Sequence, residues 1–319
     1  MKRLARSLCL ALVVAVGAAG CASSRPAAPA VTPLPRASAL PEDGRLGASA
    51  VDLATRSGAW PETERALQSA LDRLTRRCME DHGFSYPAAG VAPLPDPADD
   101  AAAAELPRRR KSGYGLASSS AASGRPASAV DRYYAVLSPR DQRRFDLTLF
   151  GRDDRKATVD IPGRGRFRVP EQGCEADSRR RLAGSVVLWA RVSYTPEAID
   201  NQLADRVPAT PEYRSALRVW RACMSARKHT YDSPETAYRA LRDQYRKTGA
   251  TSAFRKRETA VAVADGDCAV RSRLSSTALE VRRELTAELG KDVRRSLNEL
   301  ASYRAAVVAR AEETGAAGE

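Results

Sequence analysis

Two acidic side chains, Glu258 and Asp265, have a spacing that suits acid–base chemistry. They are seven residues apart, so in a helix they lie on one face, two turns from each other. Two such carboxylates serve as general acid and base when a cleft and a facing partner are present. Carboxylates at this spacing also form buried structural arrangements, in which one acid pairs with an arginine. We expect the structural arrangement, and the sequence predicts no catalytic residue.

Histidine and sulfur side chains are the other candidates for chemistry. The chain has two histidines, His82 and His229, and each follows a Cys-Met pair, at four and six residues after the cysteine. We expect each histidine at a helix end, where a positive imidazole meets the helix dipole. We expect Met79 and Met224 to fill the core. The sequence therefore predicts no metal site and no cofactor.

Motifs of known enzymes are missing from the sequence. It contains no Gly-x-Ser-x-Gly, phosphate-binding loop, calcium-binding loop or His-Glu-x-x-His. Residues 163–166, Gly-Arg-Gly-Arg, have the charge to hold a phosphate, but no helix is predicted to begin directly after them, so we expect a turn. We expect a protein that is not an enzyme, and a cleft containing Glu258 and Asp265 would argue against this.

The first residues have the pattern of an export signal. Three basic residues precede an apolar run over 8–16 and a row of small residues that ends at Cys21. The run is too short for a transmembrane helix. Its end, Ala-Ala-Gly-Cys, resembles a bacterial lipobox, although Ala18 stands where leucine is usual. We predict a protein anchored through palmitate-type acyl chains on Cys21 to the extracytoplasmic face of the cell membrane; secretion after ordinary cleavage is the alternative.

Cleavage and acylation leave four cysteines for the folded domain: Cys78, Cys174, Cys223 and Cys268. An even number in an exported chain predicts two disulfides, for which three pairings exist. The segment after Cys78 is similar to the segment after Cys223, and each half has one further cysteine. This favours one disulfide in each half, 78–174 and 223–268, with pairing across the halves as the alternative.

Composition limits the partners. The chain has 319 residues, of which 43% are apolar and 29% charged, with a net charge of +13 that becomes +10 without the signal segment. A basic surface attracts anionic wall polymers or acidic lipids. The basic residues are mostly interleaved with acids, which favours an ordinary solvated surface, with exceptions at 108–111, placed in a loop, and 179–181. Only Tyr114 accompanies the first cluster, so we expect no specific nucleic-acid binding.

Helix signals dominate the remaining chain. Proline followed by glutamate recurs after Trp, Thr or Ser, and proline suits the first helical turn. These signals and the apolar spacing predict helices at about 61–82, 171–193, 196–206, 211–229, 234–248 and 252–312, two short helices within 130–150 and a hairpin at 157–170. Breaks in the last helix are expected near Gly266 and Gly290. Its apolar stripe either packs across the whole fold or forms an arm that binds a protein partner or a second copy.

The expected fold is a mainly α-helical, disulfide-linked bundle of two related helical units with a long amphipathic C-terminal helix. The predicted order is a signal peptide (1–20), a Pro/Ala-rich tether (21–58), a first helical unit (59–193) with a disordered insertion (88–127), a second helical unit (194–313) and a tail (314–319).

The cysteine-containing segments resemble a family of uncharacterised secreted proteins and lipoproteins of actinobacteria. The resemblance rests on three patterns: Cys78-Met79-x-x-x-Gly83-Phe84-x-Tyr86, Trp220-x-x-Cys223-Met224 and Glu258-x-x-x-Ala262-x-Ala264-Asp265-x-x-Cys268. It covers roughly residues 60–290 and departs from the pattern at Lys228, where glycine is expected. The resemblance implies export and disulfides, and it implies no catalytic residues.

These observations predict a non-catalytic surface lipoprotein that acts as a binding or scaffold component of the envelope. The alternative is an extracytoplasmic ligand-binding protein with a pocket between the two units. A pocket with converging arginines and tyrosines would favour ligand binding, whereas a flat helical face with exposed Leu or Val would favour a protein partner.

Overall fold

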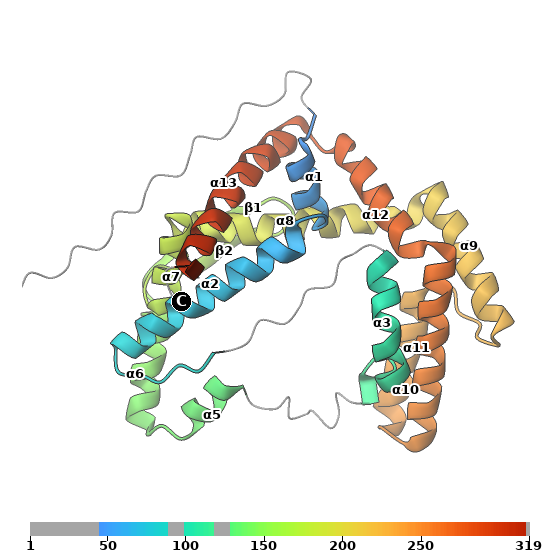
Figure 1. The fold of residues 1–319 in the computed structure, drawn as a ribbon, viewed down its shortest axis with the longest axis horizontal. Coiled ribbons are helices and arrows are strands. Elements are labelled where there is room, and N and C mark those ends of the chain that lie inside the picture. Colours follow the sequence, from blue (N-terminus) through green and yellow to red (C-terminus); the bar gives the residue numbers. More distant parts are fainter. Residues whose placement is uncertain (1–44, 89–98, 118–127, 317–319) are drawn as a thin grey trace, which may run out of the picture. The chain divides into compact units, whose positions relative to one another are not determined.

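The structure, a computed structural model, describes residues 45–88, 99–117 and 128–316 (Figure 1). The predicted signal peptide, Cys21 and most of the tether lie outside these residues. The elements are α1 (Ala48–Thr55), α2 (Trp60–Asp81), α3 (Asp99–Ser112), α5 (Ala129–Ala135), α6 (Pro139–Phe150), β1 (Lys156–Ile161), β2 (Gly165–Pro170), α7 (Cys174–Ala183), α8 (Val186–Arg206), η1 (Val207–Ala209), α9 (Pro211–Ala226), α10 (Pro234–Thr248), α11 (Ser252–Ser272), α12 (Leu274–Leu285), η2 (Thr286–Glu288) and α13 (Lys291–Ala316). The mainly α-helical fold with one antiparallel hairpin is confirmed.

Proline marks several of the helix starts, as predicted. Helices α6, α9 and α10 begin at a proline, and α2 has one at its second position. The hydroxyls of Ser138 and Ser233 accept hydrogen bonds from backbone N–H groups in the first turns of α6 and α10. These contacts satisfy donors that a helix start leaves without an intrahelical partner.

Pro196 is the exception, and the helix predicted to begin there is wrong. Helix α8 runs through this proline from Val186. The break lies ten residues earlier, because Gly184 adopts a left-handed conformation with φ +80° and Ser185 caps α8 by accepting from the N–H of Leu188. A proline inside a helix removes one helical hydrogen bond. The side chains of this segment of α8 are buried, and their packing keeps the helix continuous through Pro196. The predicted boundary between residues 193 and 194 therefore falls inside a helix.

Part of the predicted tether is folded. Residues 48–55 form α1, whose Ala50, Leu53 and Ala54 are buried, and α1 packs against α8 and α13. The prolines on which the tether prediction depended end at Pro41, before this helix. A tether is therefore compatible only with the residues before 45, which lie outside the described part of the chain.

Part of the predicted disordered insertion is also folded. Within 88–127, residues 99–112 form α3, which packs along α11 (Figure 1). Gly266 of α11 faces α3, and a Cβ there would lie 2.7 Å from Cδ2 of Leu106. The break that we expected near Gly266 is wrong, because α11 runs through this residue. The breaks lie at Arg273, which has φ +53°, and at residues 286–290.

The apolar stripe of the last helix is packed inside the fold. Leu297, Leu300 and Val307 of α13 are buried, and α13 contacts α1, α2, α7 and α8 (Figure 1). This agrees with packing across the fold rather than with a projecting arm. Of the described helices, none combines the length and the apolar character needed to cross a membrane.

Both disulfides pair as the sequence favoured. Cys78 at the end of α2 is joined to Cys174 at the start of α7, and Cys223 of α9 is joined to Cys268 of α11. The hairpin also lies where it was predicted, with Val159 opposite Phe167. Its buried face packs against α8.

Candidate functional site

The candidate site is built around Asp265, a side chain on α11 that is 3% exposed. Its Oδ2 accepts hydrogen bonds from Arg109 Nη1 at 2.6 Å and from the Tyr114 hydroxyl at 2.9 Å. Its Oδ1 accepts from Trp220 Nε1 at 3.0 Å. Three donors, one of them the Arg109 cation, therefore compensate a carboxylate that would otherwise be costly to bury. Burial and the neighbouring Asp265 raise the pKa of Tyr114, which keeps its hydroxyl protonated as a donor.

Glu258 is saturated in a different way. It is 1% exposed, and its two carboxylate oxygens accept from the backbone N–H groups of Leu116 at 2.6 Å and Ala117 at 3.1 Å. The chain reaches this position through Gly113, which has φ +59° and where a Cβ would lie 2.8 Å from Glu258 Cγ. The carboxylate thus fixes the segment after α3 onto α11.

The two acids therefore form the structural arrangement that we expected from their spacing. They share a helix but no partner, and donors from other elements occupy both. The arginine that meets Asp265 comes from α3, within the segment expected to be disordered. Both carboxylates accept hydrogen bonds from other parts of the chain, so neither is free to accept or donate a proton in a reaction.

A cavity of about 400 Å³ opens beside Asp265, and we call it the Arg–Tyr pocket. Its walls are Arg109, Tyr114, Pro234, Glu235, Tyr238, Arg239, Arg242 and Asp265. Three arginines face two acids, so the wall has an excess of one positive charge. The rings of Tyr114 and Tyr238 meet edge to face, 5.5 Å between centres. The pocket lies where the inserted segment of the first predicted unit meets the second.

Helix α10 supplies five of the eight lining residues, four of them because of the helical period. Glu235, Tyr238 and Arg242 lie at three- and four-residue steps, and Arg239 lies four residues after Glu235 and three before Arg242, so all four share one face. Sequence reasoning missed these residues, because their spacing predicts a shared helix face but not whether that face lines a pocket. The opposite side of α10 carries the buried Ala237 and Leu241, which hold the helix against the core.

The pocket arginines differ in how far they are already paired. Arg109 is held by Asp265 and lies over the Tyr114 ring, with Cζ 5.4 Å from its centre. Arg242 approaches Asp243 only at 3.9 Å, and its buried Nε has no hydrogen-bond partner among the described residues. Arg239 is exposed, and no acid of the described chain lies within 4.0 Å of it. Two guanidinium groups are thus available for an anion.

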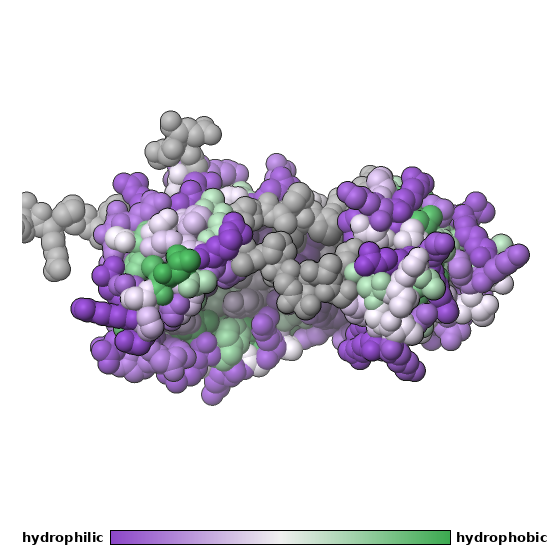
Figure 2. Space-filling model, turned by 90° about the horizontal axis from the view of Figure 1, so that it is seen from below, coloured by the Kyte–Doolittle hydropathy of each residue, from purple (hydrophilic) through white to green (hydrophobic). Residues whose placement is uncertain are grey.

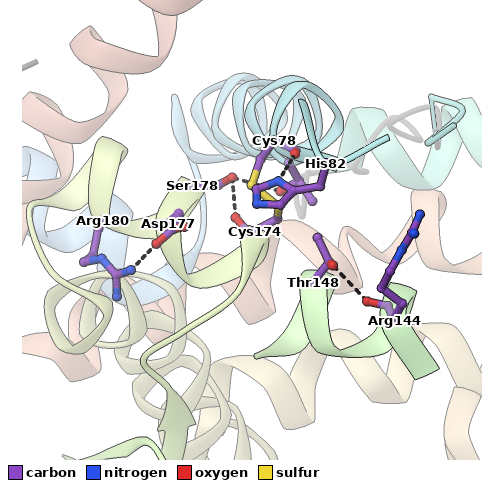
Figure 3. Close-up of a disulfide and its surroundings, with 9 residues drawn as sticks. Cys78, His82, Arg144, Thr148, Cys174, Asp177, Ser178 and Arg180 are labelled. Carbon is purple, nitrogen blue, oxygen red and sulfur yellow. Dashed lines mark hydrogen bonds and ion pairs between the residues drawn. A yellow bond between two sulfur atoms is a disulfide. The ribbon is translucent and has the colours of Figure 1, made fainter. Parts of the chain in front are cut away.

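The first disulfide lies beside a histidine, an arrangement that resembles a metal site (Figure 3). The sulfurs of Cys78 and Cys174 are bonded to each other, so neither is a thiolate ligand. The Nδ1 of His82 lies 2.7 Å from the carbonyl oxygen of Cys78, in the turn that ends α2. The ring therefore has a structural role at the helix end, as expected.

An arginine lies beside the second disulfide, at the sequence position that corresponds to His82 beside the first. Arg227, four residues after Cys223, lies with Nη1 2.6 Å from that sulfur and 3.0 Å from the sulfur of Cys268. His229 lies two residues further on. Burial, and then the charge of Arg257, lower the pKa of His229, so its positive form is disfavoured there, contrary to our expectation. The neighbouring Met79 and Met224 are fully buried, as predicted.

The two arginine clusters lie in helices and are partly paired with acids. Residues 108–111 lie in α3 rather than in a loop, and 179–181 lie in α7. Arg108 pairs with Glu105, and Arg179 pairs with Glu175 at 2.6 Å.

Comparison of the chain with protein-family models, with curated proteins and with solved structures finds no match. The chemistry of the Arg–Tyr pocket is therefore inferred from its geometry, which suits the binding of an anion.

Proposed function

We propose that the protein is a lipid-anchored, extracytoplasmic binding protein that takes a small organic anion in the Arg–Tyr pocket. The observation that carries this proposal is the convergence of Arg109, Arg239 and Arg242 with two tyrosine rings. Non-catalytic binding is favoured because Asp265 and Glu258 are occupied by donors. This is the ligand-binding alternative, which converging arginines and tyrosines were expected to favour.

The lining indicates the class of ligand. A guanidinium presents paired N–H donors that match the oxygens of a phosphate or carboxylate. The tyrosine rings offer apolar faces and a hydroxyl to the body of the ligand. Arg109 is already held by Asp265, so less side-chain freedom is lost when the ligand binds. A phosphate or carboxylate on a small polyol or ring, including a unit of an anionic wall polymer, has this chemistry.

Calorimetric titration of the full chain with glycerol phosphate and with citrate, at low salt, tests the pocket. We expect binding of at least one of them, and a roughly tenfold loss of affinity for Arg242→Gln and for Arg239→Gln, because a charged hydrogen bond contributes about 1.5 kcal/mol or more. Arg246→Gln is the matched control: it removes the same charge from α10, but Arg246 lies outside the pocket and pairs with Asp243 at 3.7 Å.

The outcomes separate the pocket from net charge. An equal loss in all three variants would show that any positive charge on α10 suffices and would contradict a defined site. Binding of neither anion by the unaltered chain would overturn the proposal.

The anchor needs its own experiment. Cys21→Ala removes the predicted acylation site, and we expect the variant to be found in the medium rather than in the membrane fraction. Retention of the variant in the membrane fraction would contradict the lipid anchor and leave the pocket proposal untouched. A scaffold role through the last helix has less support, because the apolar stripe of α13 is buried against α2 and α7.

A further inference from the structure

Helix α6 carries an unusual outer face, distinct from the Arg–Tyr pocket. Phe145 and Leu149 point into the core. The opposite face, which we call the α6 face, holds Arg140, Arg143, Arg144, Leu147 and Phe150 at three-, four- and seven-residue steps. Basic and large apolar side chains therefore share the solvent side of one short helix.

The apolar part of this face is exposed to an extent that is rare in the described chain. Leu147 is 57% exposed and Phe150 48%, and Val136, just before α6, is 81% exposed. Only two other large apolar or aromatic side chains among the described residues, Val219 and Tyr238, reach comparable exposure. Figure 2 views the side on which α5 and α6 lie and shows apolar surface bordered by hydrophilic side chains. Such a patch marks an interaction surface more often than a scattered residue does.

The charges of the α6 face are also left without acidic partners. On other helices, some arginines pair with an acid three or four residues away, as Arg76 does with Asp72 and Arg295 with Asp292. No described acid lies within 4.0 Å of Arg140, Arg143 or Arg144. The only acid in the first turn, Asp141, accepts from the Ser138 hydroxyl at 2.7 Å. Three positive charges on this helix are thus left for an external anion.

The arginines are also positioned beside the apolar residues. Arg140, Arg143, Arg144 and Leu147 line one surface hollow together with Ser138 and Asp141. Arg144 lies over the Phe84 ring, with Cζ 4.6 Å from its centre, which orients its guanidinium at the rim. The outer surface of α6 is therefore a mixed cationic and apolar plane.

We propose that the α6 face docks on the surface of an anionic lipid bilayer. Arginines at a membrane surface bind lipid phosphates, while Leu, Phe and Val enter the region between headgroups and acyl chains. A nucleic acid would use the arginines but leave the aliphatic side chains in water. The mixed chemistry of the face fits an acidic phospholipid surface, and the proposal does not depend on the ligand of the Arg–Tyr pocket.

Vesicle sedimentation tests this proposal with the full chain carrying Cys21→Ala, so that no acyl chain contributes. The vesicles contain phosphatidylcholine alone or with phosphatidylglycerol. We expect stronger partition onto the vesicles with phosphatidylglycerol and a decrease with added salt. The combined change Arg140→Gln/Arg143→Gln/Arg144→Gln should lower the partition coefficient roughly 100-fold, because each basic residue near the surface contributes about fivefold.

Two further variants keep the test specific. Leu147→Ser/Phe150→Ser leaves every charge in place and should lower the partition coefficient about tenfold or more through lost apolar burial. The control is Arg179→Gln/Arg180→Gln/Arg181→Gln on α7, which removes the same net charge and should change partition less than threefold. All variants share one N-terminus, so differences among them isolate the α6 face. Circular dichroism checks that each is folded.

Three results would overturn the proposal. The first is that the protein partitions no more strongly onto vesicles with phosphatidylglycerol than onto vesicles of phosphatidylcholine alone. The second is an equal loss in the α6 and α7 arginine variants, which would assign binding to net charge. The third is unchanged partition of Leu147→Ser/Phe150→Ser, which would exclude the apolar contact. Anion affinity of the Arg–Tyr pocket should be the same in all these variants, so failure of one proposal is distinguishable from failure of the other.

Discussion

The two disulfide-linked regions are variations on one local structure. In each, a helix ends shortly after a Cys-Met pair whose methionine is fully buried, and the chain turns back through a residue with positive φ, Gly83 or Lys228. In each, a serine four residues after the second cysteine donates to that cysteine's carbonyl oxygen: Ser178 at 2.7 Å and Ser272 at 2.8 Å. The similarity of the two sequence segments therefore reflects a shared structure.

The regions differ in what surrounds the disulfide. Three residues before its first cysteine, the first region has Thr75, which donates to Ser178 at 3.1 Å, and aromatic side chains complete the cluster. The second has Trp220 at that position, and it donates to a buried carboxylate that is paired with Arg109. One region is closed by neutral groups, whereas the other buries an ion pair beside a pocket. The same pair of disulfide-linked helices can therefore be surrounded by neutral side chains or can bury a charged pair.

Removal of each disulfide should have the largest effect and should separate the regions. The cysteines are 96 and 45 residues apart, so each bond should contribute about 4–5 kcal/mol to the free energy of unfolding. We expect Cys78→Ala/Cys174→Ala and Cys223→Ala/Cys268→Ala to lose similar amounts in denaturant titrations. Only the second pair should also weaken anion binding, because Trp220 and Asp265 each lie three residues before its cysteines.

The reverse pattern would break the comparison. If loss of the first disulfide abolished anion binding while loss of the second left it intact, the pocket would depend on the first region. Circular dichroism and unfolding curves of both double variants, measured beside the affinities, show whether a loss of binding reflects unfolding.

The buried ion pair should give the next largest effect. Asp265→Asn leaves Arg109 without its anion, and removal of one partner from a buried pair costs about 3 kcal/mol or more. Thr75→Val is the counterpart in the first region: it removes one neutral hydrogen bond and should cost about 1 kcal/mol. Urea unfolding measures both. Equal costs would show that the charge network adds nothing beyond an ordinary buried hydrogen bond.

Much of the fold followed from local signals in the sequence. Proline at helix starts, the hairpin around residues 163–166 and the pairing of four cysteines all depend on short spacings or on the similarity of the two halves. Helices α1 and α3 were missed because alanine- and proline-rich composition resembles a tether. Only packing against α8 or α11 gives these segments their helical structure, and such packing overrides composition.

The pocket was harder to predict for the same reason. Asp265 was singled out, but its partner Arg109 is 156 residues away in the chain, and spacing carries no information about such a contact. The arginines of α10 have a regular period, yet that period alone does not distinguish a pocket wall from an ordinary solvated face. What distinguishes them is the approach of α3, which Gly266 and Gly113 permit.

The smallest expected effect tests the closest similarity between the regions. Gly83 has φ +79° and Lys228 φ +62° in equivalent turns, where the next amide donates to the carbonyl oxygen of Met79 or Met224 at 3.0 Å. A side chain in this conformation costs about 1 kcal/mol or more. We therefore expect Lys228→Gly to stabilise the protein by about 1 kcal/mol and Gly83→Lys to destabilise it by a similar amount, measured by urea unfolding. No atom lies within 4 Å of a Cβ built at Gly83, so its cost should be conformational only. Destabilisation by Lys228→Gly would mean that this lysine side chain makes a contact that outweighs its backbone strain, and the two turns would then be equivalent in shape but not in energy.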